Sequence, residues 1–224
     1  MKYLIVNADD FGYSQGINKG IIEAHTKGVV TSTSLMVDAI AADEASGLSK
    51  YPNLSVGLHF VLESSPNIKL SRPEIQAEFD RQLNKFKETM GRQPSHIDTH
   101  KISPPENKDV EQVLRAYCGQ VKVPIRGFGF AKLIESFFGL NIDGTGTPDR
   151  QKISPDAFKK ALDEATDQYN EMFCHPGYSD EYLRAHSSYN EFREIELKTV
   201  TDPSLKQYIK DRGFTLCNWS KIKP

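Results

Sequence analysis

The sequence predicts an α/β fold built on a parallel sheet, either closed as a barrel or open and doubly wound. Strand-like and helix-like segments alternate along the chain, and no repeat, low-complexity tract or obvious linker interrupts them. With 224 residues, of which 38% are hydrophobic and 26% charged, the composition is that of a globular protein. The 28 basic and 30 acidic side chains leave a net charge of −2, which removes the usual electrostatic argument for a nucleic-acid partner.

The predicted strands are short apolar or β-branched runs. The first is continuously apolar, and the second is rich in valine and threonine. In chain order they cover residues 3–8, 29–37, 54–60, 95–100, 124–130, 171–175 and 214–218.

The predicted helices separate these strands, and several carry their own start or stop signals. Residues 73–90 form the clearest one, because apolar side chains recur at helical spacing up to Gly91. Ser154 and Pro155 are a typical N-cap and first-turn pair. In chain order the predicted helices cover residues 16–27, 39–50, 73–90, 107–121, 154–167 and 202–212, and residues 139–152 are expected to form a long loop.

The start of the chain and its cysteines indicate a cytoplasmic protein. A six-residue apolar run is followed at once by Asp9 and Asp10, which is too short and too acidic for a signal peptide. No apolar run approaches the roughly 20 residues needed to cross a bilayer. The cysteines, Cys118, Cys174 and Cys217, are odd in number and lack metal-type spacing, so we expect free thiols in a reducing compartment.

Polar side chains cluster at the carboxyl ends of the predicted strands. They are Asp9 and Asp10 after the first strand, His59 in the third, His96, Asp98 and His100 in the fourth, and His175 in the sixth. In parallel α/β folds this edge of the sheet carries the active site, because the strand ends converge there. His25, in a predicted helix, and His186, in a predicted loop, are set aside as bystanders.

The two adjacent carboxylates, Asp9 and Asp10, have two interpretations. They are a helix N-cap pair or a turn, or they divide the chemistry, one ligating a cation and the other accepting a proton from a bound water. Adjacent residues of an extended chain point to opposite sides. The second interpretation therefore needs a bend at Phe11 and Gly12 that brings both carboxylates to one site.

His96, Asp98 and His100 share one face of their strand by its period of two. Three ionisable groups on one face are hard to explain by packing, and an Asp beside a His can fix the tautomer and the orientation of the imidazole ring. The spacing leaves open which histidine binds a metal. His59, taken alone, is also compatible with an ordinary histidine at a strand end.

His175 and Arg126 complete the candidate set. His175 is either a capped strand end or a general acid, and Arg126 is either a surface ion-pair residue or the group that keeps a catalytic carboxylate ionised. One Asp and two His suit a divalent cation with open positions. A second Asp and a separate His then supply a base and an acid, which is the inventory for metal-assisted hydrolysis.

Six motifs occur in order between residues 4 and 177: LIVNADDFG at 4–12, GIIEA at 20–24, GVVTSTS at 28–34, GLHFVL at 57–62, SHIDTH at 95–100 and CHPG at 174–177. Together they closely resemble the YdjC-like carbohydrate deacetylases, which include bacterial chitooligosaccharide (diacetylchitobiose) deacetylases. The NADDFG opening is the most specific of these motifs.

This resemblance implies a distorted (β/α) barrel, TIM-like and related to the polysaccharide deacetylases, with residues 1–224 as one catalytic domain. It implies these site residues: metal ligands Asp10, His59 and His100, base Asp9, and acid His175. The implied reaction removes the N-acetyl group of an amino-sugar oligosaccharide and releases acetate. Arg126 joins the catalytic candidates from the residues themselves, as the group that keeps Asp9 ionised. The resemblance implies Mg²⁺ as the cofactor, whereas Asp/His/His donors also suit Zn²⁺ by their softness.

The sequence departs from the family pattern after His100. Residues 101–105, Lys-Ile-Ser-Pro-Pro, replace further histidines and an aromatic or apolar segment, so the adjoining substrate wall is expected to differ. Two other functions are weighed against the deacetylase. A different metal hydrolase, acting on a phosphoester or a cyclic amide, finds only Arg126 and Lys101 as obvious cations for a phosphate. A non-catalytic carbohydrate-binding homologue would have lost base, ligand or acid residues, which are all present.

The expected partner is therefore an N-acetylated amino-sugar or oligosaccharide substrate. Neither nucleic acid nor a membrane is expected as a partner. A homodimer stays open.

Overall fold

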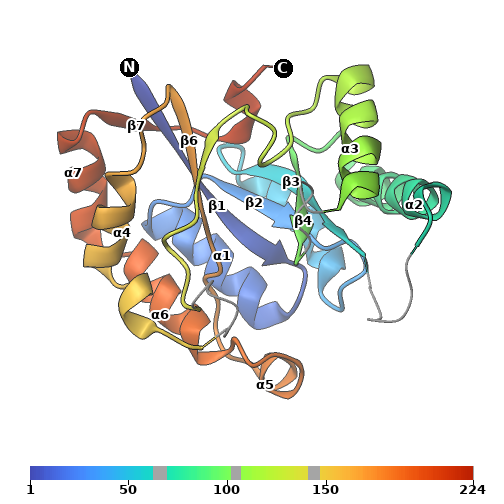
Figure 1. Ribbon diagram of the computed structural model, residues 1–224. Helices are drawn as coiled ribbons and strands as arrows, with labels where there is room; N and C mark the ends of the chain where they lie inside the picture. The colour runs from blue at the N-terminus through green and yellow to red at the C-terminus, as the bar shows by residue number, and fades with distance from the viewer. Residues whose placement is uncertain (63–69, 102–106, 141–146, 224) are drawn as a thin grey trace.

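The computed structural model describes residues 1–62, 70–101, 107–140 and 147–223, and it has the predicted alternation of strands and helices (Figure 1). The strands are β1 (Lys2–Phe11), β2 (Ser32–Leu35), β3 (Ser55–Val61), β4 (Ile97–His100), β5 (Lys132–Ile134), β6 (Tyr169–Cys174) and β7 (Phe214–Leu216). The α-helices are α1 (Gln15–Lys27), α2 (Arg72–Met90), α3 (Lys108–Val121), α4 (Pro155–Leu162), α5 (Glu181–His186), α6 (Glu191–Val200) and α7 (Pro203–Asp211). Short 3₁₀-helices are η1 (Ala42–Lys50), η2 (Arg150–Ile153) and η3 (Trp219–Lys221).

The described strands form one parallel sheet in the order β4-β3-β2-β1-β6-β5. β7 also pairs with β1, at residues Lys2 to Leu4, whereas β2 pairs with the far end of β1. The helices surround this curved sheet (Figure 1). The architecture is the incomplete, distorted (β/α) barrel that the resemblance implied.

Local sequence signals explain where the main helices begin and end. The Ser14 hydroxyl accepts a hydrogen bond from the Ile17 N–H and caps α1. α2 begins with a capping box between Ser71 and Glu74 and ends at Gly91, whose φ of 65° is left-handed. These helices match the predicted ranges to within one residue.

The prediction of a strand at residues 124–130 is wrong. Gly127 and Gly129 have φ values of 77° and 84° and turn the chain, so only Ile125 pairs, in a single bridge with Ile97. The strand of this region, β5, comes later. The Arg126 N–H still donates to the Ile97 carbonyl oxygen at 2.9 Å, which places this turn along the open edge of β4.

Two helices, α5 and α6, were not predicted. α6 buries Arg193, Glu196 and Thr199 together with apolar side chains, so it lacks the clean apolar stripe that signals a helix. α5 ends at His186, which therefore lies in a helix and not in the predicted loop. The segment predicted as a helix at 39–50 is instead the 3₁₀-helix η1.

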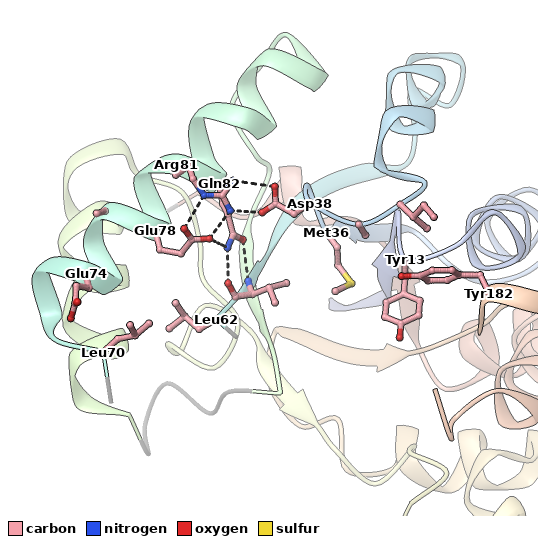
Figure 2. Close-up of a pocket in the computed structure, with 14 residues that line it drawn as sticks. Tyr13, Met36, Asp38, Leu62, Leu70, Glu74, Glu78, Arg81, Gln82 and Tyr182 are labelled. Atoms are coloured by element: carbon pink, nitrogen blue, oxygen red, sulfur yellow. Dashed lines mark hydrogen bonds and ion pairs between the residues drawn. The ribbon is translucent and has the colours of Figure 1, made fainter. Parts of the chain in front are cut away.

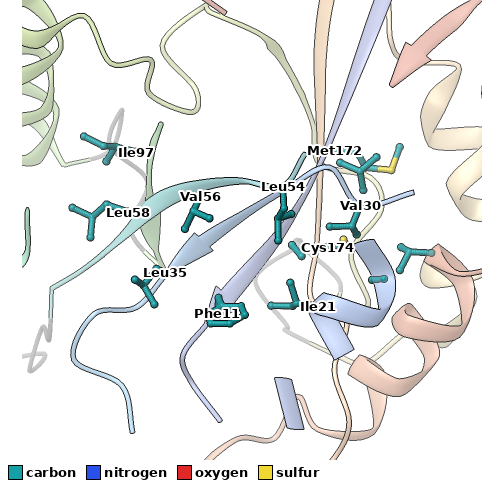
Figure 3. Close-up of a cluster of buried hydrophobic side chains, with 14 of the residues drawn as sticks. Phe11, Ile21, Val30, Leu35, Leu54, Val56, Leu58, Ile97, Met172 and Cys174 are labelled. Carbon is teal, nitrogen blue, oxygen red and sulfur yellow. The ribbon is translucent and has the colours of Figure 1, made fainter. Parts of the chain in front are cut away.

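Strand β1 is buried on both faces and organises the core. Its Leu4, Val6 and Ala8 join the large cluster between the sheet and the helices, part of which is drawn in Figure 3. Ile5 points the other way and packs with Trp219 in a second, smaller cluster. A strand covered on both faces reads as the continuous apolar run seen in the sequence.

Among the described residues, no helix is long and apolar enough to span a membrane. Cys118, Cys174 and Cys217 are free thiols, as predicted.

Candidate metal centre and active site

Asp10, His59 and His100, from three neighbouring parts of the sheet, bring three ligand atoms into a small triangle. The Asp10 Oδ1 lies 3.1 Å from the His59 Nε2 and 3.2 Å from the His100 Nδ1, and the two ring nitrogens are 3.3 Å apart. Donor atoms about 2.1 Å from one ion, at angles of about 90–109°, are separated by about 3.0–3.4 Å. The triangle therefore has the dimensions of half a coordination shell.

The backbone of β1 explains how adjacent carboxylates reach one site. Asp10 has a left-handed φ of 71°, a conformation that Asp tolerates better than most residues. The pairing register of β1 with β2 shifts between Ala8 and Phe11. The bend thus begins at Asp10 itself, before the predicted position at Phe11 and Gly12. Gly12 continues it with a φ of 96°.

Asp98 orients the imidazole of His59. Its Oδ1 lies 2.6 Å from the His59 Nδ1, which fixes the proton on that nitrogen and leaves the Nε2 lone pair facing Asp10. Burial would lower the pKa of His59, but Asp98 and Asp10 outweigh it and raise the pKa to about 10. The metal-free site therefore holds a proton where a cation would bind.

Asp9 is paired with Arg126, as one of the two interpretations of this arginine requires. The guanidinium donates to both carboxylate oxygens at 2.7 Å, and the Asn7 amide donates to the Oδ1 at 2.7 Å. Arg126 also contacts Asp98 at 3.0 Å and Glu171 at 2.9 Å. Within the described part of the chain, the Asp9 Oδ2 accepts a hydrogen bond from Arg126 alone, so it retains a lone pair for a further proton.

Arg193, on the unpredicted helix α6, is one of the site residues that sequence reasoning missed, with Glu171 and Glu196. Its Nη2 donates to the Asp10 Oδ2 at 2.6 Å. Burial would raise the pKa of Asp10, but Arg193 and the two imidazoles outweigh it and hold the pKa well below its usual range. Arg193 thus leaves Oδ1 as the oxygen of Asp10 that faces the two imidazoles.

His175 follows β6 and lies beside Asp9, because Ala8 pairs with Cys174. Its ring packs among Phe138, Phe173 and Tyr189, with centroid separations of 5.3, 5.7 and 5.8 Å. Burial lowers the pKa of His175 to about 4, although the nearby carboxylates oppose this shift.

The nearest carboxylate to the His175 ring is Glu196, on α6. Its Oε1 lies 3.9 Å from the His175 Nδ1, an atom with no hydrogen-bond partner in the described structure. Burial raises the pKa of Glu196 to about 7, and its carboxylate also accepts a hydrogen bond from the Tyr189 hydroxyl.

His96 is not part of the metal triangle. It is fully buried, stacks on Trp219 with ring centroids 5.1 Å apart, and burial lowers its pKa. The three polar residues at β4 therefore have different functions. His96 packs against Trp219, Asp98 orients the ring of His59, and His100 belongs to the triangle. Residues 102–106, which hold most of the departure from the family pattern, lie outside the described residues.

The charges of the site fit a divalent cation. Five buried carboxyl groups face two guanidinium groups, and the carboxyls are Asp9, Asp10, Asp98, Glu171 and Glu196. A second set of possible ligands, Asp9, His59 and Asp98, also lies close together. Arg126 already binds both of its carboxylates, so a cation there would face a fixed positive charge. The chain has a possible metal site at Asp10, His59 and His100.

Comparison with known proteins identifies chains that are similar in sequence and in fold. A chitooligosaccharide deacetylase from Proteus mirabilis is 36% identical over 98% of this chain and 98% of its own length. A solved structure from Enterococcus faecalis, described as a cellobiose-phosphate cleavage protein, superposes with a TM-score of 0.83 at 26% identity, covering 98% of both chains. A peptidoglycan N-acetylglucosamine deacetylase shares the fold, with a TM-score of 0.61 at 10% identity over 98% of this chain and 87% of its own.

The sequence model of the YdjC-like proteins matches residues 3–211. This range includes β1 with both aspartates, the histidines of the triangle, and both arginines that bind the aspartates. The resemblance seen in the motifs is thus confirmed over most of the chain, and the protein belongs to the YdjC-like family.

Proposed function

We propose that this protein is a metal-dependent hydrolase that removes N-acetyl groups from amino-sugar oligosaccharides and releases acetate. The observation that carries the proposal is the triangle of Asp10, His59 and His100, with the Arg126-bound Asp9 next to it. The relative from Proteus mirabilis, a chitooligosaccharide deacetylase, supports an N-acetylated sugar as the substrate class.

A divalent cation held by Asp10, His59 and His100 would act as a Lewis acid toward an amide carbonyl and would acidify water. The remaining groups perform the proton transfers. Asp9 accepts a proton at its Oδ2 as water attacks the acetyl carbon. Arg126 keeps this carboxylate oriented through two hydrogen bonds.

Cleavage of the C–N bond then needs a proton on the leaving amine, which we assign to His175. With a pKa of about 4, its imidazole is neutral near pH 7, so it must first receive the proton to be donated. Glu196, with a pKa of about 7 and its Oε1 3.9 Å from the His175 Nδ1, supplies this proton in its protonated form. The proton that Asp9 took from water balances it when both carboxyl groups return to their starting states. The products are acetate and a free amino sugar.

The two other functions weighed from the sequence are less well supported. Arg126 is bound to three carboxylates, so of the two cations considered for a phosphoester only Lys101 is left. A non-catalytic sugar-binding protein would have no need for a buried Asp9 held in a bidentate pair.

Replacing Asp9 by Asn tests the base. We expect acetate release to fall by at least about 10²-fold, with the bound metal retained, because Asp9 is outside the ligand triangle. Full activity with metal bound would remove Asp9 from this function.

Replacing His100 by Ala tests the ligand set. We expect the metal content of His100→Ala to fall. The matched control is His25→Ala, which should keep the wild-type metal content, because the His25 Nδ1 lies 2.8 Å from the Val30 carbonyl oxygen and takes no part in the triangle. Unchanged metal content in His100→Ala would refute the assignment. Metal analysis beside acetate assays with Mg²⁺ and Zn²⁺ identifies the cofactor.

A further inference from the structure

A groove of about 1120 Å³ lies beside the metal triangle and takes no part in the chemistry proposed above. It is lined by residues at the carboxyl ends of β1, β2 and β3 and by one face of α2 (Figure 2). Ligand pockets are typically about 300–1,000 Å³, so the groove has room for more than one sugar unit.

Two residues that line the groove are also neighbours of the candidate active site. Tyr13, on its wall, is three residues after Asp10, and its ring centroid is 6.0 Å from the guanidinium of Arg193. Val61, which lines the groove beside Gln82 of α2, pairs in register with His100. A chain molecule whose acetamide lies at the triangle can therefore extend into the groove.

One wall of the groove is aromatic and apolar. The rings of Tyr13 and Tyr182 lie 6.0 Å apart at an interplanar angle of 64°, and Tyr182 stacks on His186 at 4.2 Å. Ile40 is 67% exposed at this wall. Such surfaces suit the C–H face of a pyranose ring.

The opposite wall is a hydrogen-bonded polar array on α2 (Figure 2). Arg81 binds both Asp38 and Glu78, and the Gln82 amide donates to Glu78 at 2.7 Å. The Gln82 side chain is buried, whereas the partly exposed carboxylates of Asp38 and Glu78 can accept hydrogen bonds from hydroxyl groups.

The charges of the groove disfavour an anionic occupant. Its described lining includes three carboxylates, Asp38, Glu74 and Glu78, against the single cation Arg81, which two of them already bind. An anionic ligand would therefore meet no unpaired cation among the described lining residues.

We propose that this groove binds the neutral pyranose units next to the one that is deacetylated, so that the enzyme prefers oligosaccharides to single amino sugars. This inference rests on the proposed function for the location of the reacting unit. It assigns Tyr13, Tyr182 and the exposed face of α2 to substrate-length specificity.

The test fills the groove. Ala77 is an exposed α2 residue in the lining, and Ala77→Trp places a bulky ring there. The matched control is Ala116→Trp, the same change at an exposed position of α3 outside the groove. Acetate release is measured with N-acetylglucosamine and with its trimer.

We expect wild type and Ala116→Trp to prefer the trimer by kcat/KM, and Ala77→Trp to lose about tenfold of this preference, the equivalent of one stacking contact. Tyr182→Ala should reduce the preference in the same direction. Equal length preference in all variants would overturn the inference, while acetate release by the wild type would still support the proposed function.

Binding of cellotriose gives a readout that does not need deacetylation, because this trisaccharide has no amide. Titration calorimetry should show weaker binding to Ala77→Trp than to wild type and Ala116→Trp. Equal affinity for all three proteins would also overturn the assignment of the groove, even if no acetate were released from any sugar.

Discussion

Replacing Asp98 by Asn perturbs the metal site without touching a proposed ligand atom. The Asp98 carboxylate is fully buried and lies 2.6 Å from the His59 Nδ1. The variant keeps the size of the side chain but removes its negative charge, so His59 becomes a weaker and less well oriented ligand. Loss of such an orienting partner typically costs about 10–100-fold in metal affinity, or about 1.4–2.7 kcal/mol.

The proton that a bound cation must displace gives the assay. The pKa of His59 in the metal-free site is raised to about 10, so at pH 7.5 the site is protonated and metal binding should release about one proton per ion. Titration calorimetry in buffers of different ionisation enthalpy measures both the affinity and this proton. We expect Asp98→Asn to bind more weakly and to release less than one proton.

The matched control is Asp109→Asn, which removes a carboxylate that pairs with Arg72 on the surface. It should leave both quantities unchanged. If Asp98→Asn bound metal with wild-type affinity and released the same proton, the claim that Asp98 sets the tautomer of His59 would be refuted.

The remaining predictions concern proton supply, packing and pH. Glu196→Gln should lower kcat by about 10²-fold with little change in Tm. An unchanged kcat in acetate assays would show that Glu196 does not supply the proton for His175. Gly57→Ala should destabilise the fold, because the added Cβ would lie 2.4 Å from the His96 ring. In Gly119→Ala on α3 the added Cβ meets nothing within 4 Å, so this variant should stabilise the fold by about 0.5–1 kcal/mol. Denaturant unfolding measures the free energy of unfolding of both variants. Burial raises the pKa of Glu171 from 4.5 to about 7, so the folded state holds this proton more tightly and stability should fall as pH rises from 4.5 to 7. Melting curves of Glu171→Gln should show a smaller fall over that range, and an identical slope would contradict the assignment.

The sequence was sufficient for the residues that lie on strands and carry specific motifs. Asp9, Asp10, His59 and His100 could be placed at one edge of the sheet because the ends of parallel strands converge. The division of work within β4 could not be predicted, since His96 and His100 differ only in which neighbours surround them. That difference depends on Trp219, more than 100 residues away in the chain.

The contribution of α6 could not be predicted for a physical reason. Arg193 and Glu196 face the interior of the protein, where a helix ordinarily places apolar residues. Their burial is tolerated because each pairs with another site residue, Arg193 with Asp10 and Glu196 with Tyr189. Such pairs are tertiary contacts and leave no periodic signal in the sequence.

Trp219 is the only tryptophan in the chain, and its stacking on His96 makes it a natural optical reporter. His96 is two residues from Asp98, so the indole emission originates beneath the metal centre. The ring is 1% exposed and should fluoresce toward the blue, shifting to longer wavelength only when the carboxyl-terminal segment detaches from the sheet. Fluorescence of the unlabelled protein can therefore follow unfolding of the barrel interior, and comparison with the far-ultraviolet circular dichroism of the helices shows whether the two events coincide.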